Sequence, residues 1–217
     1  MSFPLRIANI HVSYDGVPVL NGIDLELAAG SVTVIAGANG AGKSTLLEVM
    51  AGVREPSSGH VDRVGSVALV VQRTAAPDEL PITVREVVAM GTWGKPGEDQ
   101  RGARGSRARL SREDRRNRVI RALDRVALAE LAERPFSALS GGQRQRALLA
   151  QGIARRASVF LLDEPASGLD FDSRERTQTL LTEEAERGAA VACVTHDEVA
   201  ILAADRVVRL DGGVRVA

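Results

Sequence analysis

Apolar positions recur along the chain with two different spacings, and together they predict an α/β fold. The segments "LRIANIHVSY" and "IDLELAAG" alternate apolar with polar residues, as half-buried strands do, with a turn at Asp15-Gly16 between them. Segments 31–37 and 64–72 are apolar almost throughout, which is typical of strands buried on both faces. A helix is expected from Lys43 to about Ala51, directly after the first buried strand.

Residues 74–139 show no strand pattern and predict helices instead. Thr83 begins the capping box "TVRE" ahead of "VVAM", and Gly91 is placed as the C′ residue that ends this helix. Ser111 is expected to cap a second helix. Between the two helices, segment 94–109 is rich in Gly and Arg; it could contact nucleic acid, but this composition more often marks a solvated loop. The apolar positions of the second helix are Val119, Ile120, Leu123 and Val126.

Strands and helices alternate again after Ser140. The pattern predicts a helix to about Arg156, a strand "SVFLLDE", a helix over 173–187, a strand "AAVACVTHD", a short helix, and a final hairpin with Asp211-Gly at its turn. Such alternation indicates a mainly parallel sheet flanked by helices, with antiparallel strands at the N-terminus and the middle third inserted as a helical unit.

Composition narrows the class of protein. The 217 residues are 44% hydrophobic and 26% charged, as in one folded globular unit, and 28 basic residues balance 28 acidic ones. Net charge therefore gives no reason to expect a polyanionic partner. The single Cys193 excludes an intramolecular disulfide, and no apolar run reaches the roughly 20 residues that span a bilayer. We expect a cytoplasmic chain whose role at a membrane would need partner subunits.

Residues 37–44, "GANGAGKS", match the phosphate-loop pattern G-x-x-x-x-G-K-[ST] between a strand and a helix. The glycines allow backbone N–H groups to surround phosphate oxygens, and the helix N-terminus adds its positive dipole. Lys43 is expected to reach the β- and γ-phosphates, and the Ser44 hydroxyl to bind Mg²⁺. The nucleotide-binding residues predicted here are Gly37, Ala38, Asn39, Gly40, Ala41, Gly42, Lys43, Ser44 and Thr45.

Two adjacent carboxylates, Asp163 and Glu164, follow the apolar run "VFLL". In a parallel sheet, ligands bind beyond the carboxyl ends of the strands, on the side of the phosphate loop. Asp163 is then expected to hold Mg²⁺ through water, and Glu164 to orient or deprotonate the attacking water. Gln72 and His196 end other buried strands; His196 could donate to a γ-phosphate oxygen, although a lone Gln or His is more often structural.

Two further features admit more than one interpretation. Tyr14 is the only tyrosine; its ring can stack on adenine, and a half-buried surface tyrosine explains it equally well. In "LSGGQRQR", Ser140 and Gln143 fit a capping box, yet Gly141 and Gly142 occupy the first helical positions, where each costs up to about 1 kcal/mol relative to Ala in a helix interior.

The ordered set Tyr14, "GANGAGKS", Gln72, "LSGGQ", "LLDEP", "SGLD" and His196 resembles the ATP-binding-cassette (ABC) ATPases, over essentially the whole chain. The resemblance implies a single ABC ATPase domain over residues 1–217. Segments 1–73 and 158–217 would form the nucleotide-binding core, and about 74–157 a helical subdomain that carries the signature segment. Ala166 stands where Thr is more usual in this family, a mild departure.

The resemblance also implies a role for each motif. Glu164 looks like the catalytic base, His196 like the switch histidine, and Gln72 like the glutamine that links the Mg²⁺ site to the transmembrane partner. Ser44, Gln72 and Asp163 would bind the Mg²⁺ of MgATP. Tyr14 would stack on adenine, and residues 167–170 would form the D-loop. The further nucleotide contacts implied are Ser140, Gly141, Gly142 and Gln143 of the signature, and Asp170 of the D-loop.

Two cassettes of this family pair head to tail, so that each ATP lies between one chain's phosphate loop and the other chain's signature. A second copy of the chain is therefore an implied partner. Gly141 and Gly142 would then leave a helix N-terminus bare, so that its amides can approach the γ-phosphate of the partner's ATP.

Three functions compete for this motif set. The chain has one cassette and no membrane span, which fits the motor subunit of a transporter. Such a subunit would act as two copies on a separate permease. A nucleic-acid or translation ATPase of the same superfamily would carry a long coiled coil or a second cassette, and an unrelated phosphate-loop kinase or GTPase leaves "LSGGQ" unexplained. The first is favoured, with no nucleic-acid partner and with the chain held on the inner face of the membrane by the permease.

The segment around and after Gln72 gives the sequence evidence on the transported cargo. "VVQRTAAPDELPITVREVVAMG" resembles the same stretch in cassettes of zinc or manganese importers, and siderophore and haem importers share part of it. His11, His60 and Cys193 have no recognisable metal-ligand spacing, so cargo would be selected by the permease and an extracytoplasmic substrate-binding protein. Zinc or manganese import is expected, with siderophore or haem import as the alternative.

Overall fold

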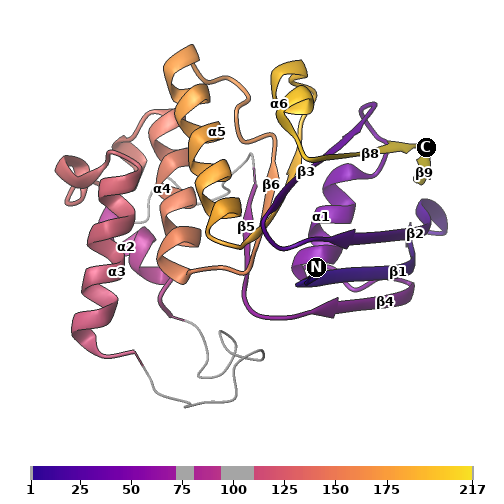
Figure 1. Ribbon diagram of the computed structural model, residues 1–217, viewed down its shortest axis with the longest axis horizontal. Helices are drawn as coiled ribbons and strands as arrows, with labels where there is room; N and C mark the ends of the chain where they lie inside the picture. The colour runs from indigo at the N-terminus through magenta and orange to yellow at the C-terminus, as the bar shows by residue number, and fades with distance from the viewer. Residues whose placement is uncertain (1, 72–80, 94–109, 217) are drawn as a thin grey trace.

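The strands form two sheets in the computed structural model, which describes residues 2–71, 81–93 and 110–216 (Figure 1). The smaller sheet is antiparallel, with the strand order β2-β1-β4. Asp15 and Gly16 both have positive φ and join the first two strands in a tight turn, as predicted. The strands of this smaller sheet are β1 (Leu5–Tyr14), β2 (Val17–Leu27) and β4 (Ser58–Arg63).

The larger sheet has the order β5-β6-β7-β3-β8-β9, and its pairs are parallel except for β9 against β8. This arrangement confirms the predicted mainly parallel core with antiparallel N-terminal strands. The carboxyl ends of the parallel strands meet at one edge, so β3, β6 and β7 deliver the segments that follow them to the same place. The strands are β3 (Ser31–Gly37), β5 (Val67–Val70), β6 (Val159–Asp163), β7 (Ala190–Val194), β8 (Arg206–Asp211) and β9 (Val214–Val216).

Both faces of the larger sheet are covered along its central strands, which explains why β3, β6 and β7 are apolar almost throughout. Along β6, Val159 and Leu161 belong to a core shared with α1 (Lys43–Ala51) and the smaller sheet. The alternate residues Phe160 and Leu162 belong to a second core with α5 (Phe171–Glu186). Helix α1 thus lies between the two sheets, and α5 lies on the opposite face of the larger one.

A helical layer with its own apolar core packs beside the sheet (Figure 1). The predicted N-caps Thr83, Ser111 and Ser140 are confirmed, each with a complete capping box. Of the apolar positions named for the second helix, Val119, Leu123 and Val126 are buried, whereas Ile120 is 37% exposed. The layer contains α2 (Val84–Met90), α3 (Arg112–Arg125), the 3-10 turns Ala129–Leu131 and Phe136–Ala138, and α4 (Gly141–Arg155).

Gly91 ends α2, but not in the way the sequence predicts. A C′ glycine normally adopts a left-handed conformation, whereas Gly91 has φ −58°, which any residue can adopt. A Cβ at this position would lie 2.0 Å from the carbonyl oxygen of Gln151 on α4. Glycine is therefore required because α2 and α4 approach closely.

Two boundaries near the C-terminus also differ from prediction. Helix α5 begins at Phe171 rather than at residue 173, because Asp170 caps it. After the short α6 (Glu198–Ala203), the final hairpin turns at Gly212 and Gly213, which both have positive φ. None of the helices in the described parts of the chain is long and apolar enough to cross a bilayer.

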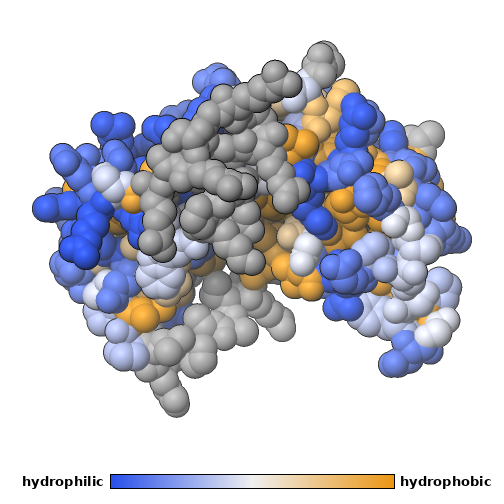
Figure 2. Space-filling view, turned by 90° about the horizontal axis from the view of Figure 1, so that it is seen from below, coloured by the Kyte–Doolittle hydropathy of each residue, from blue (hydrophilic) through white to orange (hydrophobic). Residues whose placement is uncertain are grey.

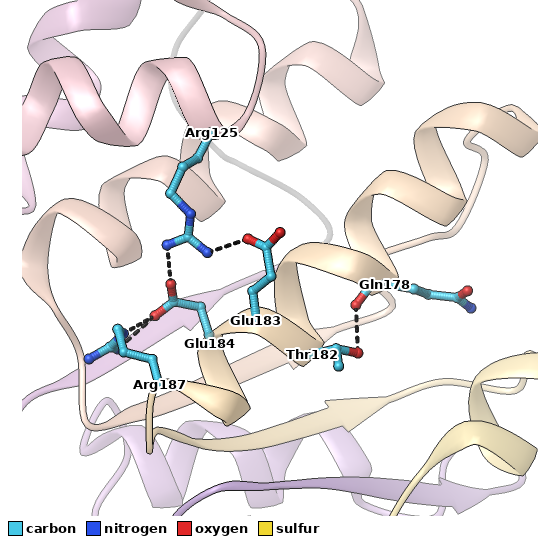
Figure 3. Close-up of polar contacts among 6 residues, drawn as sticks. All are labelled: Arg125, Gln178, Thr182, Glu183, Glu184 and Arg187. Carbon is cyan, nitrogen blue, oxygen red and sulfur yellow. Dashed lines mark hydrogen bonds and ion pairs between the residues drawn. The ribbon is translucent and has the colours of Figure 1, made fainter.

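An ion-pair network around the buried Glu184 joins the helical layer to α5 (Figure 3). Arg125, the last residue of α3, donates to Glu184 and, at 2.6 Å, to Glu183. Arg187 donates to the same Glu184 carboxylate at 2.7 Å and to the carbonyl of Ala157, just after α4, at 2.8 Å. The Glu184 side chain is only 2% exposed. This network therefore ties the ends of α3 and α4 to the C-terminal end of α5.

Candidate active site

The phosphate loop has the backbone that its glycines predict. Gly37 and Gly42 both have φ in the region that favours glycine, at 155° and 91°. A Cβ on Gly37 would lie 2.2 Å from the Leu210 carbonyl oxygen, and one on Gly42 would lie 2.7 Å from a methyl carbon of Leu20. Larger residues would therefore push the loop away from β8 and β2 and alter the direction of its backbone amides.

Lys43 lies over this loop. Its Nζ donates to the carbonyl oxygens of Gly37 and Ala38, both at 2.8 Å. An ammonium group has three donors, so the side chain is oriented by the loop and keeps donor capacity for a bound anion. Because Lys43 is also the first residue of α1, it adds its charge to the positive end of the helix dipole.

One cleft brings the phosphate loop and the acidic strand end together. It has a volume of about 340 Å³, and Lys43, Ser44, Asp163 and Glu164 all contribute to its wall. The strands β3 and β6 deliver these groups to the same edge of the sheet, as the sequence predicts. The complete lining is Val19, Asn39, Gly40, Gly42, Lys43, Ser44, Thr45, Asp163, Glu164 and Val194.

The donors in this cleft fit Mg²⁺ shared with phosphate groups. Mg²⁺ is usually bound by one or two carboxylates together with waters and substrate phosphates, and the Ser44 hydroxyl and Asp163 carboxylate line the same cleft. Across residues 2–71, 81–93 and 110–216 there is no group of three or more His, Cys, Asp or Glu that could hold a metal unaided. A Mg²⁺ ion here would complete its coordination with phosphate oxygens of the nucleotide and with water.

Glu164 is held in an unusual backbone conformation beside His196. Its φ is 49°, which costs a non-glycine residue about 1–3 kcal/mol and is typical of functional sites. Its N–H donates to the Val194 carbonyl at 2.9 Å, and its Oε1 lies 2.8 Å from Nδ1 of His196. A neutral imidazole has one N–H. His196 can therefore donate both to Glu164 and to a phosphate oxygen only when it is protonated.

Glu164 also lines a second cavity, of about 260 Å³. Arg174 and Asp197 lie there as an ion pair with 3.6 Å between Nη1 and Oδ2, which connects α5 to the segment after His196. Sequence reasoning missed both residues, since only the fold brings them next to Glu164. The cavity is lined by Glu164, Ala166, Ser167, Gly168, Arg174, Thr195, His196 and Asp197.

The signature segment lines neither cavity within one chain. Ser140 and Gln143 cap α4 reciprocally. The Gln143 N–H donates to the Ser140 hydroxyl oxygen, with 3.3 Å between N and Oγ, and the Ser140 N–H donates to Oε1 of Gln143 at 3.0 Å. A Cβ on Gly141 would meet nothing within 4 Å, whereas one on Gly142 would lie 3.1 Å from a methyl carbon of Leu169. The two glycines therefore differ: Gly141 leaves the helix end bare, and Gly142 permits close packing against the segment before α5.

The remaining predicted site residues lie apart from this cleft or outside the described residues. Asp170 accepts a hydrogen bond from the Ser173 N–H at 2.8 Å, which lowers the pKa of the Asp170 carboxyl, and so it caps α5. Tyr14 is 39% exposed at the end of β1 and does not line the cleft. The guanidinium of Arg54, which sequence reasoning also missed, lies over its ring. Gln72 falls outside the described residues.

Known proteins share this arrangement. The family model described as ABC transporter matches residues 20–167, which include the phosphate loop, the signature segment and the acidic strand end. The hemin import ATP-binding protein HmuV of Streptomyces coelicolor is 39% identical, over 94% of this chain and 73% of its own length. The manganese transport system ATP-binding protein MntB of Bacillus subtilis is 33% identical, over 90% of this chain and 78% of its own length.

Solved structures extend the likeness to three dimensions. The ATP-binding cassette MJ0796, in a dimeric post-hydrolysis state bound to ADP and Pi, is 25% identical to this chain with a TM-score of 0.79. The match covers 98% of this chain and 97% of that one. Both the helical layer and the two sheets thus have counterparts in a dimeric nucleotide-bound protein.

Proposed function

The chain belongs to the ABC transporter family of ATP-binding subunits, which are ATPases, and from this premise we propose that it drives import of a metal cation through a separate permease. One observation carries the catalytic part of the proposal: Lys43, Ser44, Asp163 and Glu164 line a single cleft at the carboxyl edge of the sheet. This is the donor set that binding and hydrolysis of MgATP require.

The phosphate-loop residues Gly37 to Thr45 would bind the nucleotide phosphates through backbone N–H groups and the Lys43 ammonium. Ser44 and Asp163, together with Gln72, would hold Mg²⁺. When bound, that ion neutralises negative charge on the phosphate oxygens. The cleft itself supports this assignment for Ser44 and Asp163, because it presents a hydroxyl and a carboxylate to the same ligand.

Glu164 would act as the general base. In the proposed step its carboxylate takes a proton from water, the water oxygen forms a bond to the γ-phosphorus, and the bond from this phosphorus to the bridging oxygen of ADP breaks. His196 would donate to a γ-phosphate oxygen and so distinguish ATP from ADP. The 2.8 Å contact between His196 and Glu164 supports a coupled role, since it joins His196 to a carboxylate that lines the cleft.

Two copies of the chain would complete each site. Ser140, Gly141, Gly142 and Gln143 of one copy would face the γ-phosphate on the other copy, with Asp170 in the adjoining D-loop. Three observations support this arrangement: the signature lines neither of the two cavities that Glu164 borders, Gly141 has open space beside it, and a structurally similar cassette is dimeric. Each copy would be a single domain, with segments 1–73 and 158–217 as the core and about 74–157 as the helical subdomain.

The permease would hold this dimer on the cytoplasmic face of the membrane. Apolar side chains gather on one face of the molecule in Figure 2, and exposed apolar patches commonly mark interaction surfaces. Trp93, which follows α2, is 65% exposed. An extracytoplasmic substrate-binding protein would deliver the cargo to the permease.

Zinc or manganese is the proposed cargo. The resemblance of "VVQRTAAPDELPITVREVVAMG" to the same stretch in metal-cation importers supports it, as does the 33% identity to MntB. Haem or a siderophore is the second candidate, because HmuV is 39% identical to the chain.

Cargo is tested by deleting the gene and measuring growth under limitation of zinc, manganese or haem. Rescue by excess zinc or manganese alone supports metal import, and rescue by haem alone contradicts it.

Glu164→Gln tests the catalytic assignment. The amide keeps the shape of the side chain but cannot accept the proton from water, so steady ATPase activity should fall by at least about 100-fold, as for loss of a general base. ATP binding should persist, and size-exclusion chromatography should show a dimer trapped by ATP. Glu198→Gln, on the first turn of α6 and outside both cavities, is the control and should hydrolyse ATP normally. Normal turnover by Glu164→Gln would show that the base is another group.

A further inference from the structure

Arg54 covers one face of the only tyrosine in the chain. It lies in the loop between α1 and β4, and its Cζ is 4.5 Å from the centroid of the Tyr14 ring. A guanidinium at this distance makes a cation–π contact. Tyr14 is nevertheless 39% exposed, so its ring keeps surface for a second stacking partner.

Hydrogen bonds on two sides hold Arg54 in this position. Its Nε donates to Oε2 of Glu48 on α1 at 2.8 Å, and its backbone N–H donates to the Glu48 carbonyl at 3.2 Å. Ser57 ties the same loop to β1: its N–H donates to the His11 carbonyl at 2.8 Å, and its hydroxyl accepts from the Ser13 N–H at 3.2 Å. Arg54 thus bridges the end of β1 and the helix that begins in the phosphate loop.

Fold stability does not explain this cluster. The Arg54 and Glu48 side chains are each 36% exposed, and exposed ion pairs contribute little to stability. Arg6 makes a comparable cluster near the start of β1, 4.8 Å from the Phe3 ring centroid and 3.3 Å from Glu26. What distinguishes Arg54 is that it connects the sole tyrosine to the phosphate-loop helix.

We propose that Arg54 is a positioning residue for the nucleobase of ATP, stacking on one face of Tyr14 so that the other face is held ready for adenine. This inference rests on the proposed function together with the role that the family resemblance implies for Tyr14, stacking on adenine. Arg54 acts through Tyr14 alone and touches no part of the nucleotide. Its influence is therefore confined to ligands that carry a base, and it disappears when the ring is removed.

Calorimetric titration with two ligands tests this role. ATP engages both the ring and the phosphate loop, whereas inorganic tripolyphosphate engages only the loop. In the full chain with Mg²⁺ present, Arg54→Ala should weaken ATP binding by about three- to tenfold and leave tripolyphosphate binding unchanged. Arg54→Lys should fall between wild type and Arg54→Ala. The matched control Arg6→Ala should bind both ligands as the wild type does.

A double variant makes the test specific to the ring. Once Tyr14→Ala has weakened ATP binding, adding Arg54→Ala should weaken it no further. Equal loss of ATP and tripolyphosphate binding in Arg54→Ala would locate its effect in the phosphate-loop helix and overturn the proposal. Unchanged or tighter ATP binding would overturn it too. Failure of the proposed function looks different, because the wild-type chain would then bind neither ligand.

Discussion

Glu184 is a buried charge paired with Arg125, the last residue of α3, and with Arg187, the residue that follows α5. Removing its carboxylate would leave Arg125 with Glu183 alone and Arg187 with the Ala157 carbonyl, both next to a newly apolar site. The two arginines left behind are 31% and 39% exposed, so their charges are partly solvated. The loss is therefore that of hydrogen bonds to a charged group, about 1.5–3 kcal/mol. We expect Glu184→Ala to lower the free energy of unfolding by about 2 kcal/mol, measured by urea denaturation.

The neighbouring glutamate provides a matched control. Glu183 bonds the same guanidinium of Arg125, but its side chain is 47% exposed. Exposed ion pairs contribute about 0–1 kcal/mol, so Glu183→Ala should cost less than about 1 kcal/mol. If both variants lose the same stability, burial of Glu184 is not what makes its pairing important.

Residues whose role follows from local chemistry can be predicted from the sequence, and residues whose role follows from the fold cannot. Lys43 and Ser44 are identified by a loop pattern in which every member is within a few positions. Asp163 and Glu164 are identified because they end an apolar run. Arg125 and Glu184 are 59 positions apart and carry no motif, so only the packing of α3 against α5 reveals their pairing.

The same distinction holds for whole elements. The starts of α2, α3 and α4 are predicted correctly because a capping box is a contact within four residues. Strand β4, "SGHVDR", has no apolar alternation and is missed; it forms because it pairs with β1, for example Leu5 with Arg63. Gly91 is identified as a helix end, but its actual requirement, the close approach of α4, is invisible in the sequence.

At the scale of the whole molecule, substitutions in the signature segment test whether two chains share a site. Gly142→Asp is an ambiguous probe, because a Cβ there already lies 3.1 Å from Leu169 of the same chain. Gly141→Asp is sharper, since a Cβ at Gly141 has open space and an acidic residue in the first turn favours the helix. The folded monomer should therefore bind ATP normally, while its carboxylate repels a phosphate brought by a second copy. ATP turnover should fall by at least about tenfold, equivalent to about 1.4 kcal/mol, and Gly141→Asn should lose less.

Mixing two impaired variants then shows whether the ATPase site is formed by two chains or lies within one chain. Lys43→Ala damages the phosphate loop and keeps the signature, whereas Gly141→Asp damages the signature and keeps the loop. In a mixed head-to-tail dimer, the intact loop of one chain faces the intact signature of the other, so one complete site is restored. ATPase activity should rise on mixing, reach its maximum near equal amounts of the two variants, and stay low in either variant alone. If the mixture stays as inactive as its components, while Gly141→Asp alone still binds ATP, the signature does not act on a phosphate held by the second copy.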